Sequence, residues 1–424
     1  MEMYDMVKKK GGVFSVRIGF AKRTITPPLG TGLGGYAGYR PCTGTHDPLW
    51  CKAAVLEDSD GCYALLSLDL LCVDESLSNR IAAAVKPLGI RAVVAAAIHS
   101  HGAPCGMIPG EGPLATVNSF GDLLDYNLAV VEAAAEASRE AMENLETFQV
   151  RGARGPAPAL GSERHTGEKA DLTMTVIQCR TESGRKLTMY QIPCHPTVLG
   201  PDNLLASADF VGGIEQRLDT DMAMFLNGAA GDISTRFTRR EQTFEECDRM
   251  AAIAAEAVET LIRDVRYTEP DLFKGLQRVI TLTARPVESS EKAQKALEEA
   301  TARWQRAADA GEEPGKLRIL KSYVEGAGVA LEFSQTMAGI RQLNLPVTVF
   351  SFAGMRFATV PGEMFSSLWS ADAVPVCYAN GYYRYIADTR AYDAGYYEAM
   401  AAILAQGQGE EFLKQISHLL EQIR

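Results

Sequence analysis

The residues best suited to chemistry in this chain are its few histidines. Only six occur, and His99 and His101 stand one residue apart, directly after the apolar run 93–98. This run is typical of a buried strand. Alternate residues of an extended chain point the same way, so both imidazoles could reach one cleft at the strand end. Imidazole is a good zinc ligand, and catalytic zinc usually takes three protein ligands and a water. Two ordinary loop histidines remain the alternative.

Two further polar turns also follow expected strands. His195 comes after residues 187–192, and the segment that contains Asp232 and Ser234 comes after residues 222–226. Ligands of open α/β sheets bind outside the carboxyl ends of strands. Asp232 could orient a ligand or the serine, and Ser234 could bind substrate or act as a nucleophile. A simple turn with a helix cap is the other interpretation of this segment.

A carboxylate and a tyrosine cluster complete the candidates. Glu363 lies just past the expected strand 356–360, where a carboxylate can ligate a metal or serve as a base. Tyr385 and Tyr397 belong to a tyrosine-rich stretch near the end of the chain. Phenol ligates zinc poorly at its ordinary pKa of about 10, although a nearby cation favours the phenolate. Aromatic packing is therefore an equally good explanation of these tyrosines.

The pattern of apolar residues predicts the elements that must position these groups. Short apolar runs alternate with stretches of helical periodicity, which indicates an α/β fold, here a layered catalytic domain with a mixed sheet, over residues 1–424. The expected strands are 13–19, 51–57, 63–71, 92–98, 172–179, 187–192, 222–226, 276–282, 347–352, 356–360 and 374–378. The expected helices are 75–85, 123–145, 212–217, 241–261 and 412–423.

One stretch looks like an insertion in this domain. Residues 289–332 are rich in Ala, Glu, Lys and Arg and are interrupted by Gly311 and Pro314, which predicts two amphipathic helices joined by a turn. Such a helical hairpin could be a lid, a contact in a homo-oligomer or a plain solvated projection.

The composition of the chain limits the kinds of partner and the cellular location that can be expected. The formal net charge is −11, which argues against a nucleic-acid partner, and the basic run Lys8, Lys9 and Lys10 reads as a solvated tail. No run of 18 apolar residues exists, so no transmembrane segment is expected, and residues 1–12 lack the apolar region of a secretory signal. Nine scattered cysteines without a C-x-x-C pair fit reduced thiols. A cytoplasmic location is therefore expected.

Taken together, the motifs resemble one family. In order, His-x-His, His-Pro-Thr, Gly-Asp-x-Ser, Pro-Gly-Glu and Asn-x-Tyr-x-x-Tyr resemble the catalytic domain of the neutral, non-lysosomal ceramidases, from about Val16 to Tyr397. The resemblance implies a zinc ion (Zn2+) held by His99, His195, Glu363 and Tyr385. It also implies substrate-side positions for His101, Ser234, Arg164 and Tyr397.

Departures from the family pattern bear on the substrate. The family's Asn-x-Gly-Asp-x-Ser-Pro-Asn appears here as residues 229–236, with Thr235 and Arg236 after the serine, and the family's immunoglobulin-like C-terminal domain is not expected. We therefore expect a zinc-dependent hydrolase that cleaves a linear amide (N-acyl) bond of a lipid or small molecule with metal-activated water. The alternatives are a hydrolase of a soluble N-acyl or ester compound, and a non-catalytic metal-binding homologue.

Overall fold

The computed structural model describes residues 15–108 and 123–423. The run Lys8, Lys9 and Lys10 and the first residues of the expected strand 13–19 lie outside this part of the chain.

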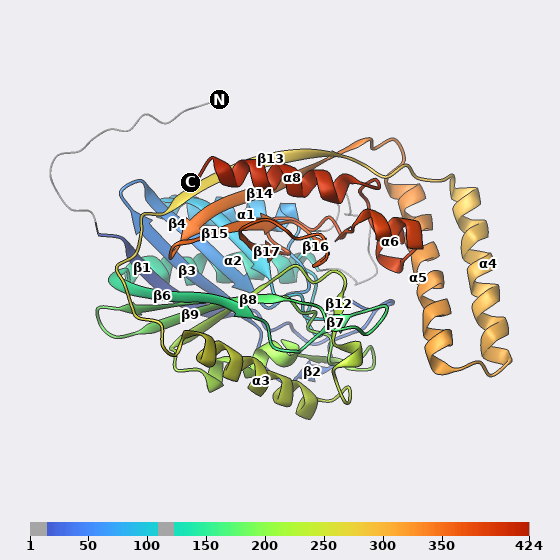
Figure 1. The fold of residues 1–424 in the computed structure, drawn as a ribbon, viewed down its shortest axis with the longest axis horizontal. Helices are drawn as coiled ribbons and strands as arrows, with labels where there is room; N and C mark the ends of the chain where they lie inside the picture. Colours follow the sequence, from blue (N-terminus) through green and yellow to red (C-terminus); the bar gives the residue numbers. More distant parts are fainter. Residues whose placement is uncertain (1–14, 109–122, 424) are drawn as a thin grey trace.

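A mixed eight-stranded sheet forms the centre of the molecule (Figure 1). Its strands, in spatial order, are β11 (Met222–Asn227), β9 (Lys186–Ile192), β8 (Thr173–Thr181), β6 (Glu146–Pro156), β1 (Arg17–Thr24), β3 (Trp50–Asp58), β4 (Gly61–Leu68) and β5 (Ile90–Ala97). The β9–β11 and β4–β5 pairs are parallel and the other pairs are antiparallel. The predicted α/β class with a mixed sheet is confirmed.

A second, four-stranded sheet packs on one face of the first. Its order is β13 (Lys274–Thr283), β14 (Gln342–Phe352), β15 (Met355–Val360) and β17 (Val374–Cys377). Phe20 of the large sheet and Phe350 and Phe357 of the small one share the apolar layer between the sheets. The next residue along β1, Ala21, belongs instead to the core on the helical side, as the period-two alternation of a strand requires.

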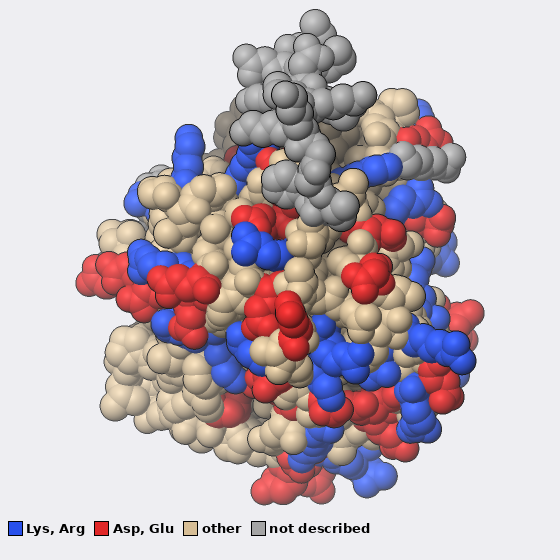
Figure 2. Space-filling view, turned by 90° about the vertical axis from the view of Figure 1, so that its left-hand side faces the viewer, with Lys and Arg blue, Asp and Glu red and all other residues tan. Residues whose placement is uncertain are grey.

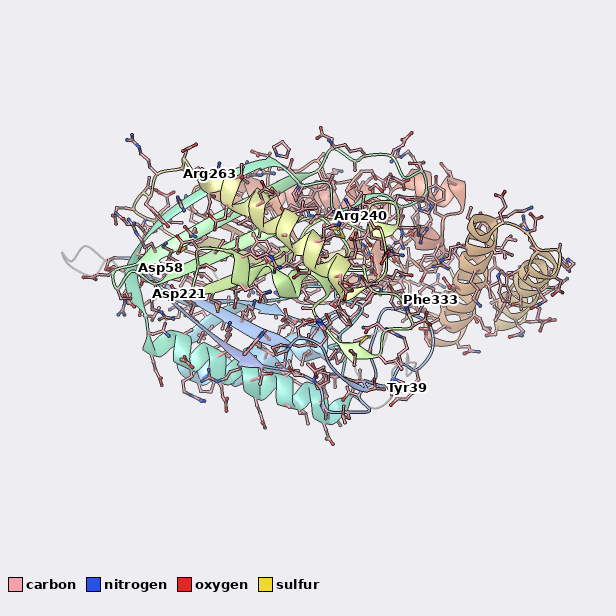
Figure 3. All side chains as sticks on the ribbon, turned by 90° about the horizontal axis from the view of Figure 1, so that it is seen from below. Tyr39, Asp58, Asp221, Arg240, Arg263 and Phe333 are labelled. Carbon is pink, nitrogen blue, oxygen red and sulfur yellow. The ribbon has the colours of Figure 1, made fainter. Side chains whose placement is uncertain are left out.

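Helices cover the two outer faces. α1 (Glu75–Val85), α2 (Leu124–Glu143) and α3 (Phe244–Ile262) lie on the large sheet, and α8 (Gln408–Glu421) lies on the small one. Figure 3 shows α2 and α3 on the same face, with strands of the large sheet visible between them. Side chains cap the starts of α1 and α3, because Asp74 accepts from Leu77 N–H and Thr243 accepts from Glu246 N–H. The result is a four-layered arrangement of helices, sheet, sheet and helix.

The predicted helical hairpin is present and projects from one end of the molecule (Figure 1). It consists of α4 (Ser290–Asp309) and α5 (Pro314–Thr336). The second half of α5 packs on the short helix α7 (Tyr397–Met400), and Glu332 of α5 pairs with Arg384 at 3.0 Å. The hairpin is therefore anchored beside the tyrosine-rich segment.

Two elements differ from the sequence predictions. Residues 212–217 do not form an α-helix but parts of two 3-10 turns, Asp209–Gly213 and Glu215–Arg217. Adjacent glycines, Gly212 and Gly213, disfavour a continuous helix here. The long strand β6 was not predicted, because its glycines and charged residues hide the alternation.

The remaining features of the fold concern the apolarity of its helices, its cysteines and its surface charges. In the described residues, no helix combines the length and apolarity needed to cross a bilayer. All nine cysteines are buried free thiols. On the end of the molecule opposite the hairpin, acidic and basic side chains are intermixed (Figure 2).

Candidate metal centre

The site lies where β5, β9 and β11 end. In Figure 3, Asp221, which directly precedes β11, lies toward the end of the molecule away from the hairpin, whereas Arg240, Tyr39 and Phe333 lie nearer the hairpin. Strand β11 therefore begins away from the hairpin and runs toward it. Asn227, the last residue of β11, is fully buried and its amide N–H groups donate to the carbonyls of Ile98 and Cys194, each at 3.1 Å. These carbonyls belong to the residues that immediately precede His99 and His195. Asn227 therefore fixes the spacing of the two histidines.

His99 is oriented by an unusual backbone conformation. Its φ of 71° lies in the left-handed region, which a non-glycine residue rarely adopts. The ring stacks on Tyr378 at 4.0 Å between centroids, and Nδ1 lies 2.7 Å from the carbonyl oxygen of Leu71. An Nδ1–H donated to this carbonyl leaves Nε2 with a free lone pair, the form that binds a metal. The expected extended chain through His99 is wrong, although His99 and His101 still share one space, with centroids 5.1 Å apart.

One carboxylate oxygen joins the two strand-end histidines. Oε2 of Glu363 lies 3.1 Å from Nε2 of His195 and 3.5 Å from Nε2 of His99. Ligand atoms about 2.0–2.1 Å from a tetrahedral zinc ion are about 3.3 Å apart, so these gaps suit one shared ion. The other oxygen, Oε1, accepts from the hydroxyl of Tyr382 at 2.5 Å. Tyr382 thus orients the carboxylate and leaves Oε2 facing the histidines.

The local charges favour the ligand form of Glu363. Burial alone would raise the pKa of its carboxyl, but His99 and His195 outweigh burial and hold that pKa well below its usual range. Burial also lowers the pKa of His195, which favours the neutral imidazole. A divalent ion takes the place of the protons on such a pair of imidazoles, and a carboxylate with imidazole nitrogens is a donor set that a divalent transition ion accepts.

His101 lies on the open side of this centre. The possible ligand atoms of His99, His101 and His195 all lie within 4.8 Å of one another, so three imidazoles form a second donor set. Burial, with His99 and His195 next, lowers the pKa of His101 well below its usual value, and its Nδ1 has no hydrogen-bond partner among the described residues. Gly35 allows this placement, because a Cβ there would meet the ring of His101 at 2.3 Å.

Tyr385 faces Glu363 across a short parallel bridge. β16 (Glu363–Met364) pairs with β18 (Tyr385–Ile386), with Glu363 opposite Tyr385. The Arg164 guanidinium lies 3.3 Å from the Tyr385 hydroxyl. Burial, followed by Glu363, raises the pKa of Tyr385 well above its usual value, and Arg164 opposes this rise. The ring of Tyr397 packs edge-on against Tyr385 at 6.0 Å.

Arg164 is held by a buried carboxylate. Its Nε lies 3.0 Å from Oε1 of Glu398, whose other oxygen lies 2.9 Å from Nε2 of His165. Glu398 is only 1% exposed. Burial would raise the pKa of Glu398, but Arg164 and His165 together outweigh burial and lower it. Glu398 therefore fixes the guanidinium that reaches Tyr385.

Asp232 does not contact the histidines or Ser234. Its two oxygens accept from the backbone N–H and hydroxyl of Ser366 and from the N–H of Ser367, at 2.6–3.2 Å. These serines follow β16, so Asp232 supports the chain that carries Glu363. Nearby N–H groups and a serine hydroxyl occupy the carboxylate, and the expectation that Asp232 orients a ligand or the serine stays a prediction.

Ser234 acts as a cap in this structure. Its Oγ accepts from the N–H of Arg236 at 3.2 Å and starts the 3-10 turn Thr235–Phe237. In the described part of the chain, no histidine or carboxylate is a hydrogen-bond partner of this hydroxyl. The simple turn-and-cap interpretation therefore describes Ser234 as the structure places it.

Comparison with known proteins gives a likeness in structure. No protein-family model matches the chain, and no curated protein matches it. A crystal structure of neutral ceramidase from Pseudomonas aeruginosa matches with a TM-score of 0.74 and 15% identity, over 97% of this chain and 75% of that one. A structure of ceramidase complexed with C2 matches with a TM-score of 0.73 and 16% identity, over 97% and 76%. The fold is that of neutral ceramidase. At this identity the likeness establishes the fold alone.

In this ceramidase fold, the predicted residues separate into two groups. The first group shares one space at the strand ends, with His99, His101, His195 and Glu363 at its centre and Arg164, Tyr385 and Tyr397 beside them. The second group, Asp232 and Ser234, supports neighbouring chain.

Three residues with clear positioning contacts were missed from the sequence: Asn227, Tyr382 and Glu398. Asn227 had a usable signal as the polar end of a strand. Tyr382 also had a signal, as the first tyrosine of the Asn-x-Tyr-x-x-Tyr motif. Glu398 had none, since its partner Arg164 is distant in the sequence.

Proposed function

We propose that this protein is a zinc-dependent hydrolase that cleaves an amide (N-acyl) bond. The observation that carries the proposal is the single oxygen of Glu363 that faces Nε2 of both His99 and His195. The ceramidase fold supports the reaction class. In this proposal His99, His195 and Glu363 hold the ion, with Tyr385 as the fourth protein group. When bound, zinc lowers the pKa of a coordinated water to about 7 and polarises a carbonyl oxygen.

The chain's own residues would stabilise the developing negative charge. Arg164 is fixed by Glu398 and points at Tyr385, so a donor is already in place before the substrate arrives. Preorganised donors need no reorganisation during the reaction, which is why they stabilise a transition state strongly. The hydroxyl of Tyr397 is a second donor on this side, and burial raises the pKa of this phenol to about 12, so it remains protonated at neutral pH.

His101 is suited to proton transfer or substrate positioning. Its lowered pKa keeps the imidazole neutral at pH 7, and Nδ1 is not occupied by another group. A neutral imidazole can accept a proton at one nitrogen or donate from the other. We assign His101 to the leaving-group side, and Ser234 to positioning the adjacent turn.

A second candidate is a metal-binding protein without turnover. The three imidazoles of His99, His101 and His195 favour it, since they could hold an ion without Glu363. Full occupancy of the open position by His101 would leave no place for a water. The two candidates therefore predict different results in a turnover assay.

The experiment is a hydrolysis assay of the zinc-loaded protein on amides and esters with long and short acyl chains. We expect turnover of amides that chelation abolishes and zinc restores. His99→Ala should abolish both zinc binding and turnover. His418→Ala is the matched control, because this side chain is 75% exposed on α8. Zinc bound without turnover across the panel would reject the hydrolase and favour the second candidate.

A further inference from the structure

Two arginines beside the candidate centre form no ion pair with a carboxylate of the described residues. Arg236 and Arg239 follow Ser234 and are half-buried. Arg236 Nη1 donates to the carbonyl of Arg164 at 3.3 Å, and Arg239 Nη1 donates to the carbonyl of Thr197 and to Thr235 Oγ1. Within residues 15–108 and 123–423, no carboxylate lies within ion-pair distance of either guanidinium. In this part of the chain all their hydrogen-bond acceptors are neutral groups, so neither guanidinium has a direct ion-pair partner there.

The two guanidiniums flank the candidate centre. Arg236 contacts the backbone of Arg164, whose own guanidinium reaches Tyr385. Arg239 contacts Thr197, two residues after His195. The two charges therefore lie next to both the tyrosine side and the histidine side of the site.

A third arginine, from the hairpin, adds to the same field. Arg318 of α5 acts electrostatically on both Arg236 and Tyr36, and Tyr36 packs edge-on against His101 at 4.9 Å. Arg318 has its own carboxylate, Glu325, at 3.1 Å. The charge without a direct partner in the described residues therefore belongs to Arg236 and Arg239.

The position of Arg236 is unfavourable for its positive charge. Burial, followed by Arg164 and Arg318, lowers the pKa of Arg236 to about 10, which shows how unfavourable the charge is at this position. In contrast, Glu398 neutralises Arg164 directly. Unpaired charges beside a reactive centre are typical of sites that bind an oppositely charged ligand.

We propose that the substrate carries a carboxylate that Arg236 and Arg239 bind, so that the amide is an N-acyl amino acid rather than an uncharged lipid amide. This inference rests on the proposed hydrolysis of an N-acyl bond. Guanidinium binds carboxylate through two parallel N–H donors, which fixes the orientation of the substrate as well as its charge. The scissile carbonyl of such a substrate lies a few bonds from its carboxylate, which matches arginines adjacent to the centre.

The test compares two amides that differ only in charge, N-octanoylglycine and N-octanoylglycinamide. We expect the zinc-loaded protein to prefer N-octanoylglycine, and Arg236→Gln to raise its KM roughly 10- to 100-fold. The KM for N-octanoylglycinamide should not change. Arg236→Lys, which keeps the charge, should restore part of the preference. Arg240→Gln is the matched control, because Arg240 is an exposed neighbour with the same charge.

A direct binding measurement separates this inference from the proposed function. Calorimetric titration with both compounds should show tighter binding of N-octanoylglycine, lost in Arg236→Gln and kept in Arg240→Gln. That result supports the anion site even when neither compound is hydrolysed, in which case the proposed function alone fails. Equal binding of the two compounds by the unmodified protein, or an equal loss for both in Arg236→Gln, would overturn the inference.

Discussion

Two polar turns at the same end of the large sheet use their side chains in opposite ways. After β5 and β9, His99 and His195 direct Nε2 at one oxygen of Glu363, and Nδ1 of His195 has no hydrogen-bond partner within residues 15–108 and 123–423. After β11, the side-chain oxygens of Asp232 and Ser234 accept hydrogen bonds from backbone N–H groups and from a neighbouring serine hydroxyl. Buried polar groups are normally satisfied, so groups left facing one another are the ones available to a ligand. In the proposed function, the histidine turns are therefore the reactive part, and the serine turn supports them.

The largest difference between the turns should appear with Glu363→Gln. This change keeps the shape and removes the charge that faces both histidines. We expect zinc affinity to fall by more than the roughly 10- to 100-fold typical of an outer-shell partner, and turnover to be lost. Competition with a chromogenic chelator measures the affinity. Glu421→Gln on the exposed end of α8 is the control, and unchanged affinity in Glu363→Gln would remove this carboxylate from the centre.

Glu398→Gln should have the next largest effect, on stability. Removing one member of a buried ion pair costs about 3–5 kcal/mol, so the free energy of unfolding should fall by about 3 kcal/mol at pH 7. The pKa of Glu398 is lowered in the folded protein by Arg164, against the effect of burial. Its charge therefore adds stability above about pH 4.3, the ordinary value, and this stability disappears as pH falls through the lower folded-state pKa.

Urea unfolding at several pH values measures this penalty. The difference between the natural chain and Glu398→Gln should be largest at neutral pH and should shrink in acid. A difference that stays constant between pH 7 and strongly acidic pH would show that Glu398 is not an ionised partner of Arg164.

Asn227→Ala should have a smaller effect on zinc affinity. Asn227 lies at the end of β11 and bonds the residues that precede both histidines. The substitution removes the amide that spaces His99 and His195 and leaves two buried carbonyls without a donor. We expect roughly a 10- to 100-fold loss of zinc affinity. Asn144→Ala is the control for stability, because Asn144 makes a comparable bridge to Phe20. An equal loss of zinc affinity in both variants would mean that Asn227 has no specific effect on the centre.

The smallest effect should come from Ser234→Ala. Losing a cap costs about 1 kcal/mol of stability, and turnover should remain within a few-fold of the natural chain. Removal of a serine nucleophile, in contrast, lowers kcat by about 10⁶-fold. Steady-state kinetics on the best amide therefore distinguishes the two roles, and a loss near the larger figure would reverse the assignment of the two turns.

The positions of His99 and His195 could be predicted because the signal is local. Each follows an apolar run long enough to identify a strand, and strand ends in α/β sheets gather on one side. The approach of Glu363 to Tyr385 had no such signal, because β16 and β18 are two residues long and show no periodicity. Only the resemblance to the ceramidases placed these residues together.

Contacts between distant residues explain the remaining differences. The sequence around Asp232 suggested a ligand partner, but the nearest free N–H groups belong to Ser366 and Ser367, which fold against it from far along the chain. Glu398 pairs with Arg164 in the same way. The left-handed backbone conformation of His99 could not be predicted either, because residues other than glycine rarely adopt it.

Metal analysis of the purified protein by X-ray absorption tests the central claim most directly. The account predicts one zinc ion per chain with nitrogen and oxygen ligands at about 2.0–2.1 Å and no sulfur neighbour at about 2.3 Å. The distinction between nitrogen or oxygen ligands and sulfur ligands is informative because the chain has nine buried free thiols, which could bind zinc instead. Loss of that signal in His195→Ala would support the centre. A protein that binds no ion after zinc is supplied, or one whose ion has thiolate ligands, would contradict it.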